Sequence, residues 1–518
     1  MKYRRAIVCL SVFAMLVSAV TGQEKEVRLS LDESIATALR NNLNVAVEIL
    51  NPELSEISIS QAKEKFLPQL ALEFGNQHSN TPSYSFLEAA EEVTSDFHEY
   101  QAKLLQQIPT GGQFSIDLYS YKSDSNQRFQ TINPRYGSSL SFNFKQPLLK
   151  NFGFKTSRKE IIVARNNLDI SETKFKGILM NTIYSVEKAY WDLAYSVAHL
   201  EVMRQSLKLA QDLLAKNKRE VEVGTLAPIE VLTAEAEVAT READILQGEV
   251  AVKNNEDSLR TVINLKAENK DMAVTIVASD SPRYEEFSIT VDEALRKGLE
   301  NRPDLQELRL DIKNKDIEAG YAKNQLLPEL TLNASYWSPG LSGSQLLYQD
   351  DNPLSGVIIG VVPGNASDAL RDALNFRYNN WYVGLTLSVP TNTVFSRAQY
   401  AQARVNLEKK QLELESKEQQ VFLEIRNAVR AVETNFKRIN AYKIARQLAE
   451  RKLEAEEKKL KVGLTTNYIV LQHQRDLATA RSNELKAVAD YILSQAALDK
   501  AMGTTLISKN VKPGMLSR

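Results

Sequence analysis

Residues 62–70 read AKEKFLPQL, and residues 322–330 read AKNQLLPEL. The two phrases lie 322 − 62 = 260 residues apart, and each closes a run with helical spacing just before a proline. Proline disfavours the helical conformation in the residue before it and has no N–H to continue a helix. Pro68 and Pro328 therefore mark two equivalent points at which the chain leaves a helix, and they predict a duplicated unit.

The duplication extends upstream of both prolines. Residues 31–70 and 291–330 align without a gap, and each copy begins with a hydroxyl residue, Ser30 or Thr290, followed three positions later by a glutamate. This spacing is the capping box of helix starts. Each copy is therefore predicted to open with one uninterrupted helix that ends near its proline.

Downstream of each proline the apolar residues alternate with polar ones, which predicts β-strands. Returning strands, at 139–145 and 381–388, end at Pro147 and Pro390, so each copy holds at least a pair of strands. Residues 100–121 also alternate around a Pro-Thr-Gly-Gly turn. The sequence leaves open whether this hairpin joins the other strands or lies outside them.

Long helical segments with apolar residues seven apart follow the strands in each copy, which predicts helices that coil around one another. Two reversals interrupt these segments, in KREVEVGTLAPIEVL from Lys218 and in KKLKVGLTTNYIVL from Lys458. A glycine accepts the left-handed conformation that ends a helix. In the second copy, Arg446 and Glu484 interrupt the apolar rows.

The N-terminus has the order of a secretory signal peptide, with basic residues, an apolar run and then small residues, over residues 1–22. The only cysteine, Cys9, lies in it, so no disulfide is predicted in the mature chain. The predicted organisation is a first repeat at 23–288, a second repeat at 289–505 and a tail at 506–518. No later stretch is apolar enough for a spanning helix, so entry into a bilayer would require strands.

Charge and motifs argue against nucleic-acid-binding proteins and enzymes. The chain has 64 basic and 65 acidic residues, so no overall positive charge indicates a nucleic-acid partner. The four histidines are scattered, and the zincin, P-loop and dinucleotide motifs do not occur. The sequence therefore predicts no enzyme, no catalytic residue, no metal site and no cofactor.

The duplicated order of helix, strand pair, long helix, Val-Gly turn and shorter helix resembles the TolC-like outer membrane efflux protein family. The residues that carry the resemblance are the two LPxL phrases, QPLL at 146–149, WYVGLTLSVP at 381–390 and the two turns. The resemblance implies a mainly α fold with a membrane β part: a homotrimer in which an outer-membrane barrel of 12 strands continues into a periplasmic α-helical barrel. Four strands per chain are too few to close a barrel, which needs about eight.

The same resemblance implies a passive exit duct for efflux or type I secretion, in the outer membrane of a Gram-negative-type bacterium and in contact with its lipid. A periplasmic adaptor and an inner-membrane pump are the implied partners. The alternative is a periplasmic coiled-coil scaffold without a pore, against which the alternating strands with aromatic faces argue. The cargo and the partner pump are not identified by the sequence.

Site residues follow from the resemblance by position. The two turns match the adaptor-docking tip, and residues just inside the tip match a tunnel constriction. In this chain Glu230 is acidic, but its second-copy counterparts are not, so weak cation selectivity is expected. The strand–helix junctions are marked by prolines. The residues are Val223, Gly224, Thr225, Leu226, Val462, Gly463, Leu464 and Thr465 at the tip, Glu230, Ile469 and Gln472 at the constriction, and Pro68, Pro147, Pro328 and Pro390 at the junctions.

Overall fold

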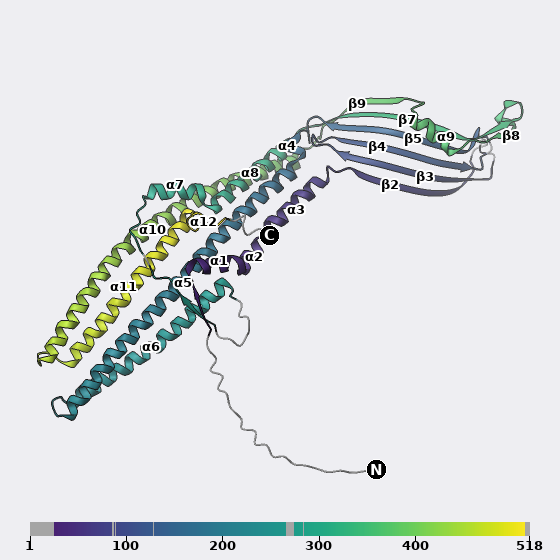
Figure 1. Cartoon of the computed structure of the whole chain (residues 1–518). Coiled ribbons are helices and arrows are strands. Elements are labelled where there is room, and N and C mark those ends of the chain that lie inside the picture. The colour runs from purple at the N-terminus through teal and green to yellow at the C-terminus, as the bar shows by residue number, and fades with distance from the viewer. Residues whose placement is uncertain are drawn as a thin grey trace, which may run out of the picture. The chain divides into compact units, whose positions relative to one another are not determined.

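The computed structural model describes residues 25–84, 88, 90–127, 129–265, 274–282 and 284–512. The predicted signal peptide and Cys9 lie outside the described residues. The chain forms two compact units, and each unit takes segments from both copies of the duplication (Figure 1). The first unit comprises Met1–Val47, Ile178–Glu300 and Leu423–Arg518, and the second comprises Glu48–Gly177 and Asn301–Phe422.

The second unit is built on an antiparallel sheet. Its strands pair in the order β2-β3-β4-β5-β7. Both β8 and β9 pair with the remaining edge of β7, β9 along its first half and β8 near its end. In Figure 1, β2 and β9 lie on opposite sides of the set. The strands are β2 (Gln69–Pro82), β3 (Glu92–Gln107), β4 (Gln113–Ser125), β5 (Ile132–Pro147), β7 (Glu329–Tyr348), β8 (Ile358–Val362) and β9 (Asn380–Ser388).

The hairpin that the sequence left unassigned is therefore part of this sheet. Residues 100–121 fall in β3 and β4, which lie between β2 and β5. The predicted turn around Gly111 is present, because the Ile108 N–H donates to the Gly112 carbonyl at 2.8 Å and Gly111 has φ +96. The first copy thus contributes more than the strand pair that the 12-strand count assumed.

The prolines stand at changes of structure. Pro68 and Pro328 directly precede β2 and β7, Pro147 is the last residue of β5, and Pro390 lies between β9 and the next helix. The second unit also contains α3 (Leu50–Glu64), α4 (Phe154–Ser157), α8 (Pro303–Asn324), α9 (Ala366–Leu374) and two short 3-10 turns, Gln349–Asp351 and Pro353–Ser355. Helix α9 packs on β5 and β7.

The prediction of one uninterrupted opening helix is wrong in both copies. The first copy breaks between α1 (Leu31–Asn41) and α2 (Leu43–Glu48), where Asn42 is extended and its side-chain oxygen accepts the Asn44 N–H at 2.9 Å, and again at Ile49 before α3. The second copy breaks between α7 (Val291–Asn301) and α8, where Arg302 is extended before Pro303. A residue before proline avoids the helical conformation.

The predicted capping box is complete at the first helix start, and half of it is present at the second, where the Glu293 carboxylate pairs with Lys297 instead. The Glu33 N–H donates to Ser30 Oγ at 3.2 Å, and the Ser30 N–H donates back to the Glu33 carboxylate at 2.9 Å. The Glu293 N–H likewise donates to Thr290 Oγ1 at 3.2 Å. Each bond satisfies a backbone N–H that the first helical turn leaves without a partner.

Long helices dominate the first unit. Helices α5 (Lys159–Glu222) and α10 (Val394–Lys461) end in it, and each reverses into a shorter helix, α6 (Pro228–Ile263) or α11 (Asn467–Met502). Strand β1 (Lys25–Leu29) pairs in parallel with β6 (Val274–Ala278). The short α12 (Thr505–Ser508) overlaps the start of the predicted tail, of which residues 513–518 lie outside the described residues.

The heptad rows of the second copy form a core. The members Ile425, Val432, Ile439, Leu453, Val470, Leu477, Tyr491 and Leu498 are all buried. The two charged residues that interrupt these rows, Arg446 and Glu484, form an ion pair with each other. The interruptions therefore compensate each other across α10 and α11.

The heptad row predicted for α6 is Val231, Val238, Ile245, Val252 and Leu259. Leu259 is fully buried, and the other four are half-buried. In the first part of α6 the buried positions lie three residues further on, at Ala234, Arg241 and Gly248. Ala234 and Gly248 allow the neighbouring helices to approach closely, and the Arg241 side chain reaches backbone carbonyls of two of those helices.

None of the helices within the described ranges combines the length and the apolar character needed to cross a bilayer.

Candidate functional site

The first reversal joins α5 to α6 through a tight C-terminal cap. Gly224 has φ +77, a conformation that costs residues with a Cβ. The Thr225 N–H donates to the Glu220 carbonyl at 2.9 Å, and the Gly224 N–H donates to the Val221 carbonyl at 3.0 Å. This pair of bonds is the Schellman motif, and Pro228 then begins α6 at a position where its missing N–H costs nothing.

The second reversal, between α10 and α11, has the same geometry. Gly463 has φ +75, the Leu464 N–H donates to the Lys459 carbonyl at 2.9 Å, and the Gly463 N–H donates to the Leu460 carbonyl at 3.1 Å. A Cβ built at either glycine would meet no atom within 4 Å. The backbone conformation, rather than lack of space, therefore requires glycine at both turns.

Both turns expose apolar side chains. Val223, Val462 and Leu464 are 74%, 69% and 77% exposed. Leu226 and Thr465 are half-buried, and Thr225 is exposed. Val223, Val462 and Leu464 therefore bury only about a quarter to a third of their surface within this chain, and most of each side chain is available to a partner.

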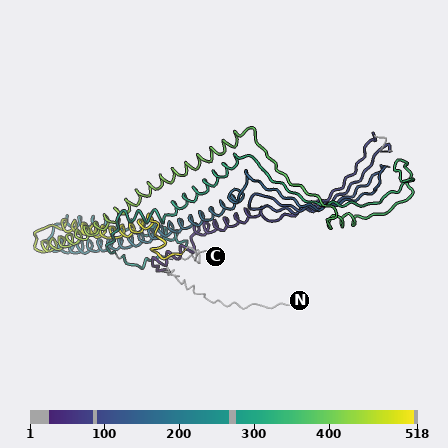
Figure 2. The backbone as a smooth tube through the Cα atoms, turned by 90° about the horizontal axis from the view of Figure 1, so that it is seen from above, coloured from purple at the N-terminus to yellow at the C-terminus, as the bar shows by residue number. Residues whose placement is uncertain are grey.

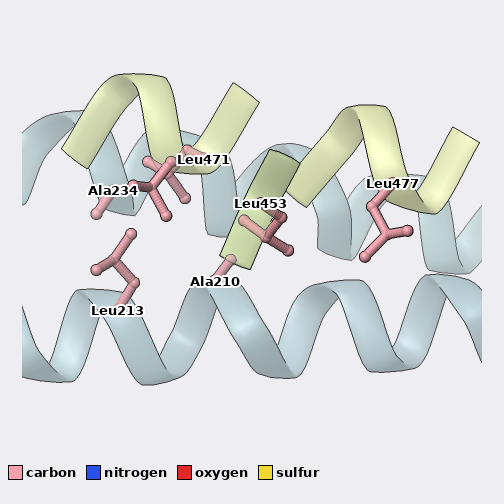
Figure 3. Packing of buried hydrophobic residues seen from close by; sticks show 7 residues of the cluster. Ala210, Leu213, Ala234, Leu453, Leu471 and Leu477 are labelled. Carbon is pink, nitrogen blue, oxygen red and sulfur yellow. The ribbon is translucent and has the colours of Figure 1, made fainter. Parts of the chain in front are cut away.

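A shared core holds the two helix pairs together behind the turns. It contains residues of all four helices, which Figure 3 shows pointing toward one another. In Figure 2 the reversals close the long helices at one end. The buried members are Ala210, Leu213, Ala234, Leu453, Val470, Leu471 and Leu477.

Arg241 is buried near this core, and sequence reasoning did not single it out. Its guanidinium donates to the Ser206 carbonyl of α5, to the Leu471 carbonyl of α11 at 3.2 Å and to the Glu237 carboxylate at 3.0 Å. Burial lowers the pKa of Arg241, and the contact with Glu237 opposes that shift. Arg475 of α11 also pairs with Glu237, so α5, α6 and α11 share one charged network.

The three constriction candidates lie in the first two turns of α6 and α11. Glu230 is the third residue of α6 and is half-buried, and its Oε2 is buried with no hydrogen-bond partner in the described part of the chain. Ile469 and Gln472 are exposed. These turns therefore present one carboxylate from the first copy and no acidic group at the two matching positions of the second.

The sheet of the second unit has two unlike faces. Residues paired directly across antiparallel strands point to the same face, so the register defines both faces. One face is apolar, with Leu70, Leu72, Phe74, Tyr100, Ala102, Leu104, Ile116, Leu118, Leu140, Phe142, Ala334, Tyr336, Trp381, Val383 and Leu385. The other is mainly polar, with Glu73, Glu99, Gln101, Lys103, Ser115, Asp117, Ser141, Asn143, Asn333, Ser335 and Thr386.

Comparison with protein families identifies the chain. The family model described as outer membrane efflux protein matches residues 34–265 and 294–504. The chain belongs to this outer membrane efflux protein family. The two matched segments follow the two copies of the duplication, and the resemblance predicted from the LPxL phrases and the Val-Gly turns is confirmed.

Curated relatives of this outer membrane efflux protein are named as outer membrane or secretion proteins. It is 24% identical over 424 residues to outer membrane protein TolC of Vibrio cholerae, covering 80% of this chain and 85% of the relative. It is 23% identical to the alkaline protease secretion protein AprF of Pseudomonas aeruginosa, covering 70% and 68%. Its fold is similar to that of the CmeC outer membrane channel of Campylobacter jejuni, with a TM-score of 0.63, 15% identity and coverage of 94% and 89%.

Family membership establishes the broad function. The protein is an outer membrane channel for efflux or secretion, located in the outer membrane and extending into the periplasm. The family is one of transport channels rather than enzymes.

Proposed function

We propose that the protein is the passive exit duct of a tripartite efflux or type I secretion system. The observation that carries this proposal is the two-faced sheet, because an apolar face suits lipid and a polar face suits a water-filled lumen. An inner-membrane pump would supply the energy, and a periplasmic adaptor would connect pump and duct.

Three copies would share one barrel in the outer membrane. Within the described residues, β2 forms one edge of the sheet, and β9 and β8, which pair with different parts of β7, form the other. A membrane cannot hold an unpaired edge, since its backbone groups would lose water without gaining partners. A homotrimer closes these edges, and its long helices would form the periplasmic α-helical barrel.

The two turns form the adaptor-docking tip in this proposal. Support comes from the exposed side chains of Val223, Val462 and Leu464 and from the identical caps of the two reversals. An adaptor that brings apolar helix ends to this tip would bury those side chains. Docking would then favour the open arrangement of the helix pairs over the closed one.

The tunnel would be narrowest near Glu230, Ile469 and Gln472. With one carboxylate per chain at these positions, three copies place a ring of only three acidic groups there. We expect weak cation preference and weak block by divalent cations. The repeat boundaries, 23–288 and 289–505, remain the proposed evolutionary units.

A substitution at the tip tests the docking step. Val223→Asp combined with Leu464→Asp places charge on the proposed docking surface without altering the glycines that form the turns. We expect the variant to reach the outer membrane at the normal level but to lose export, measured as increased retention of transported compounds in cells that lack the native gene.

The matched control keeps the shape of the side chains. Val223→Thr combined with Leu464→Met should export as the native protein does. Normal export by the aspartate variant would contradict docking at these turns. A gene deletion that leaves the cellular retention of every tested compound unchanged would contradict the efflux role itself.

A further inference from the structure

We propose that the β3–β4 hairpin is part of the membrane wall, so that each chain contributes six strands and three chains close a barrel of 3 × 6 = 18 strands. This inference rests on the proposed function, in which three copies share one barrel. It replaces the expectation of 12 strands with a wider pore, and it names the strand edges through which the copies meet.

Continuous pairing is the first support. β3 pairs with β2 from Gln69↔Leu105 to Pro82↔Glu92, and β4 pairs with β5 from Gln113↔Lys145 to Ser123↔Arg135. β2 and β5 are separated by the hairpin and do not pair in the described sheet. Moving the hairpin out of the wall would break both ladders, and β2 and β5 would have to form a new pairing that the described sheet does not contain.

The hairpin has the same two faces as the strands around it. Tyr100 and Leu104 continue the apolar face and are 52% and 37% exposed, as an outward-facing row requires. Leu104 lies between Leu70 of β2 and Ile116 of β4. A hairpin in water on both sides would have no reason to maintain this alternation at the level of the neighbouring apolar band.

The polar face of the hairpin is tied to the flanking strand. Asp117 of β4 is buried, and its carboxylate accepts hydrogen bonds from Ser115 at 3.0 Å and from the Asn143 side chain of β5 at 3.1 Å. Lys103 Nζ of β3 lies 3.7 Å from the same carboxylate. These charges lie on the face opposite the apolar band, where they contact one another and where a membrane barrel tolerates polar side chains.

The turn of the hairpin is fixed to the strand–helix connection. The Gly153 N–H donates to the Thr110 carbonyl at 2.9 Å, and the Thr110 hydroxyl contacts Gln146 Oε1 at 2.7 Å. A Cβ at Gly111 would lie 2.2 Å from the Asn151 carbonyl oxygen. The turn therefore packs closely where it would reach the periplasmic rim.

An even number of strands makes closure between copies geometrically consistent. Neighbouring strands of this sheet alternate in direction, so the first strand, β2, and the last, β9, run in opposite directions. β2 of one copy can thus pair in antiparallel fashion with β9 of the next, as bacterial outer-membrane barrels require. Six strands are also too few to close within a single chain, for which about eight are needed.

The added strands set the width of the pore. With strands about 4.8 Å apart and tilted by about 40°, an 18-stranded barrel has a backbone diameter of about 36 Å, against about 24 Å for 12 strands. The lumen cross-section therefore grows by a factor of about two. A pore of this width would leave the periplasmic end, rather than the barrel, to limit the size of the cargo.

Lipid exposure of single cysteines tests the position of the hairpin. Cysteines at Ala102 and Leu104 represent its apolar face, and cysteines at Gln101 and Lys103 represent its polar face. The purified protein is reconstituted with brominated lipid, each cysteine carries a bimane label, and quenching by the lipid is measured. We expect at least twofold stronger quenching at Ala102 and Leu104.

Strand β9 supplies the matched control, because it belongs to the wall for any number of strands. Cysteines at Val383 and Leu385 should be quenched by lipid, and a cysteine at Thr386 should not. If β9 alternates but the β3 labels are all quenched weakly, the hairpin lies outside the wall and the 18-strand inference is wrong. If β9 does not alternate either, the proposed membrane barrel itself fails.

Barrel diameter gives a second test. Electron cryomicroscopy of the full chain should give a barrel about 36 Å wide, and a variant that lacks residues 92–125 should give one about 24 Å wide, since β2 would then pair with β5. A full-length barrel about 24 Å wide would overturn the inference. That result decides the matter even if the deletion variant does not fold.

Discussion

Replacing the charged residues that interrupt the second-copy rows should reveal how the helix pair tolerates them. Arg446 of α10 and Glu484 of α11 form a charge-assisted pair, with side chains 27% and 20% exposed. Arg446 also contacts both oxygens of Glu450 at 3.0 Å, and Arg481 contacts Glu450 at 3.1 Å. The perturbation is a cycle of three variants: Arg446→Leu, Glu484→Leu and both together.

The contacts predict unequal costs for the two single variants. Without Arg446, the Glu484 carboxylate stays in a partly buried helix interface, and no other cation of the described residues pairs with it. We expect a cost of about 2–3 kcal/mol. Without Glu484, Arg446 keeps Glu450, so the cost is about 1 kcal/mol. Two leucines restore an apolar heptad row, so the double variant should be as stable as the native protein or more stable by about 1 kcal/mol.

These differences in stability are measured on the detergent-solubilised protein by thermal unfolding, followed through the helical signal in circular dichroism. The order of apparent Tm should be Arg446→Leu lowest, then Glu484→Leu, then the native protein and the double variant together. The cycle should show a coupling of about 3–4 kcal/mol. Equal losses in the two single variants, or a double variant whose loss is the sum of both, would refute the reasoning.

Three further outcomes follow from single residues. Gly463→Ala should destabilise the tip by about 1 kcal/mol, because residue 463 has φ +75. Gly320→Ala lies inside α8, where no atom stands within 4 Å of an added Cβ, and should stabilise the protein by a similar amount. A lower Tm for both variants would contradict this. Burial alone would raise the pKa of Asp304, but Arg302 and Lys417 lower this pKa to about 2. The ionised carboxylate should therefore stabilise the fold above about pH 4, and this stability should be lost as the pH falls toward 2. A pH profile of Tm that Asp304→Asn leaves unchanged would argue against this contribution. Glu230→Gln should barely alter cation preference in planar-bilayer recordings, and a strong preference that this variant abolishes would disprove weak selectivity.

Local signals in the sequence predicted a large part of the fold. Pro68 and Pro328 mark the strand starts, because the effect of proline on its predecessor requires no distant partner. Gly224 and Gly463 mark the reversals for a similar reason, since the left-handed cap is a property of the turn itself. The rows from Ile425 are buried as a heptad predicts.

Other features depend on partners that the sequence does not reveal. The hairpin at 100–121 joins the sheet through pairing with β2 and β5, and alternation alone does not specify a neighbour. The buried Arg241 guanidinium donates to the carbonyl of Leu471, which lies 230 residues further along the chain, so the local sequence does not reveal this partner. The break at Asn42 was harder to foresee than the break before Pro303, because an asparagine inside an apolar run is compatible with a continuous helix.

Chemical crosslinking of the separated outer-membrane fraction tests the central claim most directly, since the account requires that several copies share one pore in that membrane. We expect a species with the mass of three chains in the outer membrane. A water-soluble periplasmic monomer or dimer, absent from the membrane fraction, would contradict the account.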